Sequence, residues 1–293
     1  IADGCSNRCT YCAIPLIRGP RVSVPEEELI DEAKRLVDSG VKEIILIAQD
    51  TSSYGVDLYG KPMLAQLLNK ISSIEGLYWL RVLYTYPDTV TQELLDTIRE
   101  NDKIVNYIDM PIQHINGELL NMMNRRGSPD NIKRIYDTVR KAPGRFILRT
   151  TAILGFPGET EAQFNELKIF FKEYPFDRLG AFTYSPEEDT PASGFYEQID
   201  EYTKQRRLAE IMGQQSRISL MLNRQREGEA VDTLIERIHG NTAYGRSYAE
   251  APEVDGLIYF ELPPGMRNSL KPGDITRTKL LEAFEYDIRG EIL

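Results

Sequence analysis

Strand-like and helix-like segments alternate along the first ~200 residues, and this alternation constrains the fold most. Five short, nearly continuous apolar runs are typical of buried parallel strands: 43–48, 79–84, 105–110, 146–154 and 179–184. Helical periodicity separates or follows them, over 23–39, 64–73, 89–100, 129–141 and 161–174. Alternation of this kind predicts an α/β fold with a parallel sheet and right-handed crossovers. With residues 1–2 as the expected tail of a sixth strand, it favours a partial (β/α)6 barrel over an eightfold one.

The pattern changes near Gly228. Before it, residues 201–227 form one long, charged helix candidate. After it, strand-like pieces alternate with Gly, Pro and Asn turns: 231–238, 243–248, 256–261, 274–282 and 285–293. Short strands at this spacing predict a small closed antiparallel β-barrel. We therefore expect two domains, residues 1–227 and 228–293.

Composition and charge exclude some classes of function. The chain has 293 residues, 41% of them hydrophobic, and no apolar run approaches the ~20 residues of a membrane span. No signal peptide is visible, so we expect a cytoplasmic protein with no membrane partner. The net charge of −10 is the wrong sign for a general nucleic-acid binder. A basic partner would suit this charge better, and nucleic acid is not expected as the main substrate.

The three cysteines of the chain are Cys5, Cys9 and Cys12. Three thiolates on one loop can hold three irons of a four-iron cluster and leave the fourth iron open for chemistry. A disulfide framework is disfavoured by the odd count. A structural zinc site would need His114 or His239 to complete it, and it lacks the usual second pair of cysteines. Inert buried cysteines are disfavoured by the polar loop around them.

Polar residues follow each predicted strand, at the edge where parallel barrels keep their working residues. They comprise the cysteine loop, Gln49-Asp50-Thr51, Tyr86-Pro87, Gln113 with His114, residues 155–160 and residues 187–190. Glycine at Gly155 would let the backbone approach a bound cofactor closely. Arg149 lies within a strand and would meet a carboxylate of a ligand or of the protein itself. For any single residue, the general polarity of loops accounts for the pattern equally well.

The spacing Cys-x3-Cys-x2-Cys, with Tyr11 just before the last cysteine, resembles the radical S-adenosylmethionine (SAM) superfamily. The resemblance implies that the open iron binds SAM and that one electron from the cluster cleaves SAM to a 5'-deoxyadenosyl radical. It implies that Cys5, Cys9 and Cys12 bind a [4Fe-4S] cluster. The expected contacts to SAM are Tyr11, Gln49, His114, Arg149, Gly155 and Glu159, and no catalytic side chain is assigned.

Further motifs resemble the methylthiotransferases, and the C-terminal barrel resembles their TRAM domain. These motifs are Ile-Ala-Asp-Gly-Cys at 1–5, Ile-Ala-Gln-Asp-Thr at 47–51, Met-Pro-Ile-Gln-His at 110–114, Asn-Arg-Arg-Gly at 124–127, Gly-Phe-Pro-Gly-Glu-Thr at 155–160 and Tyr-Ser-Pro-Glu-Glu at 184–188. The family inserts sulfur at an unactivated carbon and methylates it with a second SAM, which requires a reducing electron donor. It also carries a second [4Fe-4S] cluster in an N-terminal domain that this chain lacks. We therefore expect this fragment to bind one cluster and SAM without completing turnover.

Two branches of that family differ in substrate. One modifies an adenosine of tRNA, and the other, the RimO type, modifies the β-carbon of an aspartate in the twelfth protein of the small ribosomal subunit. Residues 228–293 hold seven Lys or Arg and twelve Asp or Glu, which suits a basic protein better than tRNA. Gln49-Asp50-Thr51 and Glu187-Glu188 resemble the ribosomal-protein branch, although Asp189 departs from the glycine expected in either.

The expected partner is therefore a small-subunit ribosomal protein or the ribosome. Two alternatives stay open, a tRNA adenosine methylthiotransferase and a non-enzymatic iron–sulfur or zinc scaffold. Arg125, Arg126 and Gly127 would contact the target peptide or cover a helix end.

Overall fold

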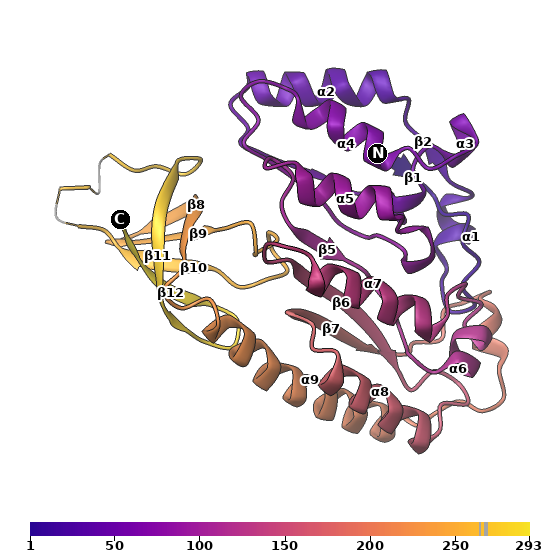
Figure 1. Cartoon of the computed structure of the whole chain (residues 1–293). Helices are drawn as coiled ribbons and strands as arrows, with labels where there is room; N and C mark the ends of the chain where they lie inside the picture. Colours follow the sequence, from indigo (N-terminus) through magenta and orange to yellow (C-terminus); the bar gives the residue numbers. More distant parts are fainter. Residues whose placement is uncertain (264, 267–268) are drawn as a thin grey trace. The chain divides into compact units, whose positions relative to one another are not determined.

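Two parallel sheets form the centre of the first of two compact units. The computed structural model describes residues 1–263, 265–266 and 269–293, and the units are 1–213 and 214–293 (Figure 1). The first unit contains the parallel strands β3 (Glu43–Leu46), β4 (Trp79–Val82), β5 (Tyr107–Asp109), β6 (Ile147–Leu154) and β7 (Arg178–Thr183). β3 pairs with β4, and β5, β6 and β7 pair in that order. An isolated parallel bridge between Leu80 of β4 and Ile104, just before β5, connects the two sheets. The predicted α/β fold with a partial barrel is confirmed, and among the described residues it has five parallel strands where six are expected.

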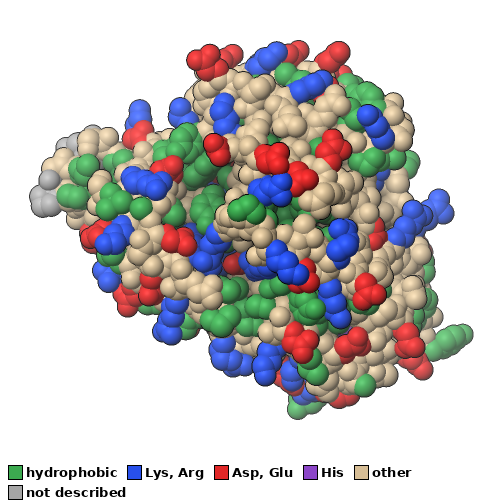
Figure 2. Space-filling model, viewed as in Figure 1, with side chains coloured by type: hydrophobic (Ala, Val, Ile, Leu, Met, Phe, Trp, Pro, Cys, Tyr) green, Lys and Arg blue, Asp and Glu red, His purple; other side chains and the backbone are tan. Residues whose placement is uncertain are grey.

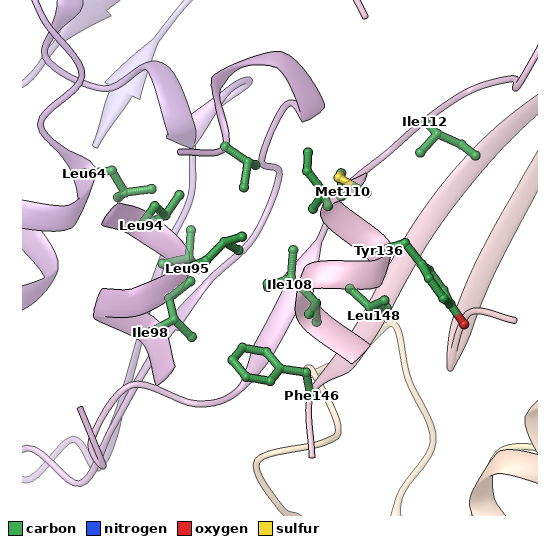
Figure 3. Packing of buried hydrophobic residues seen from close by; sticks show 14 of the residues in the cluster. Leu64, Leu94, Leu95, Ile98, Ile108, Met110, Ile112, Tyr136, Phe146 and Leu148 are labelled. Carbon is green, nitrogen blue, oxygen red and sulfur yellow. The ribbon is translucent and has the colours of Figure 1, made fainter. Parts of the chain in front are cut away.

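The helices between these strands follow the predicted periodicity. They are α2 (Glu26–Asp38), α4 (Leu64–Ser72), α5 (Gln92–Glu100), α7 (Pro129–Lys141) and α8 (Glu161–Glu173). Side chains cap the start of α8, where Thr160 and Gln163 form a capping box. Figure 3 shows Leu94, Leu95 and Ile98 of α5 on the side of the helix nearest Ile108 of β5. Apolar helix faces and buried strands thus share one core.

Several shorter helical segments are not predicted by the sequence. They are α1 (Ile14–Arg18), α3 (Val56–Tyr59), α6 (Gly117–Met122) and the 3₁₀ turns η1 (Thr51–Ser53), η2 (Pro87–Thr89) and η3 (Pro191–Gly194). One or two turns carry too little periodicity to be recognised in a sequence. Most of them lie in the loops that follow the strands, and they therefore shape the site.

The first residues differ in pairing from the expected strand tail. β1 (Ala2–Asp3) pairs antiparallel with β2 (Val22–Ser23), and it is not part of the parallel sheet. The amino group of Ile1 donates to the carbonyl of Ile47, 2.9 Å away, just after β3. The hairpin of β1 and β2 therefore starts beside the end of β3. The cysteine loop is the segment between β1 and β2.

The second unit is a closed five-stranded barrel. Its strands are β8 (Ala230–His239), β9 (Thr242–Arg246), β10 (Ile258–Glu261), β11 (Ile275–Ala283) and β12 (Ile288–Ile292), in the order β10-β12-β11-β8-β9. Four pairings are antiparallel as predicted, but β10 and β12 run parallel. A closed ring with an odd number of strands cannot alternate direction throughout, so one parallel pair is unavoidable.

The long helix α9 (Glu201–Arg224) belongs to both units, which divide within it. The domain boundary expected near residue 228 stays a prediction. None of the helices in the described residues has the length and apolarity needed to cross a membrane. Figure 2 shows Lys and Arg side chains interspersed with Asp and Glu over the visible face.

Candidate functional site: the cysteine loop and the strand ends

The loop that carries the cysteines is closed at its neck by a glycine. Gly4 has a φ of +65°, and a Cβ there would lie 2.3 Å from the carbonyl oxygen of Pro20. Only glycine permits this approach of the two ends. The amide of Cys5 then donates to the carbonyl of Gly19, 3.1 Å away. The sequence between Gly4 and Gly19 is therefore held as a compact loop.

Asp50, four residues after the end of β3, anchors this loop to the sheet. Its buried carboxylate accepts from Asn7 Nδ2 (3.1 Å) and pairs with Arg21 Nη2 (3.3 Å), one within the cysteine loop and one just after it. It also accepts from the hydroxyls of Ser52 and Ser53, at 2.8 and 2.6 Å. A carboxylate with this many donors is well compensated for its burial. Asp50 therefore links the loop to the end of the first full strand.

The three cysteines line two adjoining hollows. Cys5, Cys9 and Cys12 are unpaired thiols in both walls. The larger hollow, of about 520 Å³, is also lined by Arg8, Pro20 and Asp189 among others. Asp189 has a φ of +60°, in the left-handed region that favours the glycine expected there. Asp189 therefore adopts the left-handed conformation of the glycine expected at this position.

The smaller hollow, of about 160 Å³, lies where the parallel strands end. Besides the cysteines, its lining residues are Asn7, Tyr11, Ile14, Gln49, Tyr84, Thr85, Tyr86, Pro111, Gln113 and Arg125. Gln49 follows β3, Tyr84 to Tyr86 follow β4, and Gln113 follows β5. The structure therefore brings the cysteine loop together with three of the strand ends named from the sequence.

The three thiols lie in the walls of both hollows. Among the described residues, no group of three His, Cys, Asp or Glu side chains forms a site for one metal ion. In a four-iron cluster each cysteine binds a different iron. Burial raises the pKa of the Cys5 and Cys12 thiols, and the negative charge of neighbouring groups adds to it. A metal bound by these thiols would therefore have to displace protons from them.

His114 and Glu159, both expected to contact SAM, are bonded to each other. The Nε2 of His114 lies 3.3 Å from Glu159 Oε1, and its Nδ1 accepts from the Asn116 amide at 2.9 Å. Glu159 Oε2 accepts from the amide of Gly155 and pairs with Arg207 Nη1 at 2.8 Å. Both side chains are fully buried and neither lines the two hollows that hold the cysteines. With both ring nitrogens engaged, His114 is a poor zinc ligand.

Of the other residues expected to contact SAM, some line the hollows and one is paired with a carboxylate of the protein. Gln49 and Tyr11 line the smaller hollow. Arg149 Nη1 pairs with Asp109 Oδ1 at 2.8 Å, and Asp109 is completely buried. The sequence allows Arg149 to pair either with a carboxylate of a ligand or with one of the protein. In the structure, Arg149 pairs with one of the protein.

The sequence predicts Arg125 at the target peptide or over a helix end, and it does not predict Arg125 beside the cysteines. It lines the smaller hollow beside the cysteines and its side chain is buried. It follows the short helix α6 and not a strand. Its position in the sequence therefore does not indicate that it lies at the strand ends. For Tyr86 and Gln113, the sequence predicts a place at a strand end and no particular role.

Comparison with known proteins gives these observations a family context. A family model described as the radical SAM superfamily matches residues 1–171, and one described as the TRAM domain matches 228–293. Two curated relatives named "Ribosomal protein uS12 methylthiotransferase RimO" are close in sequence. The one from Clostridium botulinum (strain Okra / Type B1) is 46% identical over 100% of this chain and 65% of its own length. The one from Thermoanaerobacter sp. (strain X514) is 47% identical over 99% and 66%.

Solved structures share the fold at low identity. Coproporphyrinogen III oxidase (HemN) from Escherichia coli superposes with a TM-score of 0.54 at 13% identity, over 96% of this chain and 65% of its own. The radical SAM methyltransferase TsrM from Kitasatospora setae gives a TM-score of 0.52 at 15% identity, over 82% and 41%. This chain itself spans about two thirds of the length of the curated relatives, 65% and 66%.

Proposed function

The chain belongs to the radical SAM superfamily, and from this premise we propose that it is the radical SAM and TRAM part of a methylthiotransferase. The observation that carries the proposal is the convergence of Cys5, Cys9 and Cys12 with Gln49 and Gln113 around one hollow. Cysteines on a rigid loop, at the carboxyl ends of parallel strands, provide a cluster site facing a substrate cavity.

In this proposal the three cysteines hold a [4Fe-4S] cluster, which together with SAM supplies a 5'-deoxyadenosyl radical when both are bound. The protein's own residues position and enclose these groups. Gln49 and Tyr11 line the hollow directly. His114, Glu159, Gly155 and Arg149 act one step away, because their hydrogen bonds and ion pairs fix the loops after β5 and β6.

The proposed substrate is an aspartate of ribosomal protein uS12, modified at its β-carbon. The relatives' names support this choice, and so does the excess of acidic residues over basic ones in the barrel, since ribosomal proteins are basic. We further propose a cytoplasmic protein that takes electrons from a reducing donor. A second [4Fe-4S] cluster would lie in the part of the relatives' length that this chain does not span.

The test is mass spectrometry of uS12 and of tRNA from cells that lack the gene. Loss of the methylthio mass from uS12 alone is expected, with restoration by the wild-type gene. Restoration should fail with Cys9→Ala, while Lys34→Arg, a change at an exposed residue of α2, should restore it. Loss from tRNA alone would move the protein to the tRNA branch.

A scaffold role has a separate test. The purified protein, reconstituted with iron and sulfide and then reduced, should cleave SAM to 5'-deoxyadenosine. A scaffold would bind metal without cleaving SAM, and a zinc site would show zinc and no iron in elemental analysis.

A further inference from the structure

Arg125 enters the cysteine site from a turn that is bonded to the cysteine loop. The turn follows α6, and Asn124 has a φ of +50° there. Asn124 Nδ2 donates to the carbonyl of Arg8 at 2.6 Å, and the amide of Thr10 donates to the carbonyl of Met123 at 3.0 Å. These bonds hold the turn against the cysteine loop on both sides of Cys9. The position of Arg125 is therefore coupled to that of the loop.

The direct partners of the buried guanidinium are all uncharged. Its Nη1 donates to the hydroxyl of Tyr11 at 3.0 Å, and its Nη2 donates to the carbonyl of Pro111 at 2.6 Å. Its Cζ lies over the ring of Tyr86, 4.3 Å from the centroid. In the described part of the chain, no carboxylate lies within ion-pair distance of it. A fixed positive charge is thus buried with a hydroxyl, a carbonyl and a ring.

Two other buried arginines, Arg81 and Arg207, have carboxylate partners. Arg81 pairs with Glu43 at 2.7 Å, also over a tyrosine ring, and Arg207 pairs with Glu159 at 2.8 Å. The carboxylate of Asp88 interacts with Arg125 only through space, and burial still raises the pKa of Asp88 above its usual value. A buried charge without a partner costs free energy of folding. We therefore expect the anion that balances Arg125 to lie in the hollow that Arg125 lines.

The groups in that hollow that can carry negative charge are the cysteine thiolates. Arg125 lines it together with Cys5, Cys9 and Cys12. Burial alone would lower the pKa of the guanidinium, but the neighbouring phenols and the ionised form of Cys9 raise the pKa overall. Thiolates with a cluster carry net negative charge, and one-electron reduction increases it.

We propose that Arg125 is the counter-charge of the cluster: a positioning residue that stabilises the thiolate-bound cluster and favours its reduced form. The proposal rests on the cluster site proposed above. The electron comes from the external reductant and no bond changes at Arg125. Removal of the positive charge should therefore make the cluster harder to reduce, because the added electron meets less compensation.

The test compares Arg125→Met, Arg125→Gln and Arg125→Lys in the purified, reconstituted protein. The readouts are iron per chain, the midpoint potential from a titration followed by electron paramagnetic resonance, and the dissociation constant for SAM. The midpoint potential should shift to a more negative value in both neutral variants, and by less in Arg125→Lys. Arg126→Met is the matched control, since it removes the same charge from the next, exposed residue, and its potential should equal that of the wild type.

Each other outcome has a defined meaning. Failure of both neutral variants to retain iron, with a folded chain by circular dichroism and retention in Arg125→Lys, supports the counter-charge role. Loss of the fold before iron is added, in both neutral variants, would overturn it and make Arg125 a residue of the fold alone. An unchanged potential with weaker SAM binding would also overturn it and pair Arg125 with the SAM carboxylate. Absence of a cluster in the wild type would refute the proposed function itself.

Discussion

His114 and Glu159 form a buried pair, in which the Nε2 of the imidazole lies 3.3 Å from Oε1 of the carboxylate. His114 follows β5, and Glu159 belongs to the loop after β6. Glu159 also holds Arg207 of α9 through its second oxygen. The pair therefore joins two strand-end loops and a covering helix, which is a supporting role for the site.

Glu159→Gln should lower the free energy of unfolding by about 2–4 kcal/mol, because Arg207 and the Gly155 amide lose a charged acceptor in a buried place. Urea denaturation of the protein without cofactor measures this. Glu161→Gln is the control, since Glu161 also bonds Arg207 but is largely exposed, and it should change stability little. Wild-type stability with weakened SAM binding in Glu159→Gln would instead make Glu159 a direct contact to the cofactor.

Asp50→Asn should reduce iron incorporation. The neutral amide pairs less well with Arg21 and cannot accept from all the donors that surround the carboxylate, so the cysteine loop loses its attachment to β3. We expect a loss of about 2–3 kcal/mol in stability and less iron per chain by elemental analysis.

The control for Asp50 is Asp3→Asn, which removes an exposed carboxylate paired with Arg18 near the same loop. Its iron content should match that of the wild type. Equal iron content in Asp50→Asn and the wild type would show that the loop orders itself without this carboxylate.

The strands are predictable from the sequence, but the directions of the site side chains are not. The apolar runs 79–84 and 105–110 contain strands in which every residue is buried, and continuous hydrophobicity is typical of strands covered on both faces. A residue's place at a strand end says which loop it joins. It does not say whether His114 turns to the hollow or to Glu159, because that depends on packing between loops far apart in sequence. Arg125 shows the same limit, since its place depends on a turn that bonds to residues 8–10.

The stability contributed by Asp57 should depend on pH. Partial loss of contact with water raises the pKa of its carboxyl, but hydrogen bonds from the hydroxyl and amide of Ser23, at 2.6 and 2.7 Å, outweigh this and lower the pKa overall. A lowered folded-state pKa gives stability that is present above the unfolded value of ~3.9 and is lost as pH falls through the folded value.

Asp57→Asn should therefore cost about 1 kcal/mol at pH 7, a small amount because the residue is exposed. The difference from the wild type should shrink near pH ~3, below the unfolded pKa. Thermal unfolding at the two pH values measures it, with Asp31→Asn as an exposed control on α2. A difference that grows as pH falls would contradict the assigned direction.

A buried ion pair of the barrel unit offers the last prediction. Arg226 and Glu250 are almost completely buried and bonded to each other, and Glu250 also accepts from the amide of Ser247 at 2.9 Å. Glu250→Gln leaves the Arg226 charge buried with a neutral partner, and about 3–5 kcal/mol should be lost. Hydrogen exchange should therefore become faster at the amides of β8 to β12. Glu282→Gln, in the exposed pair with Arg289, should cost less than about 1 kcal/mol. Equal effects of the two substitutions would mean that burial does not strengthen the Arg226–Glu250 pair.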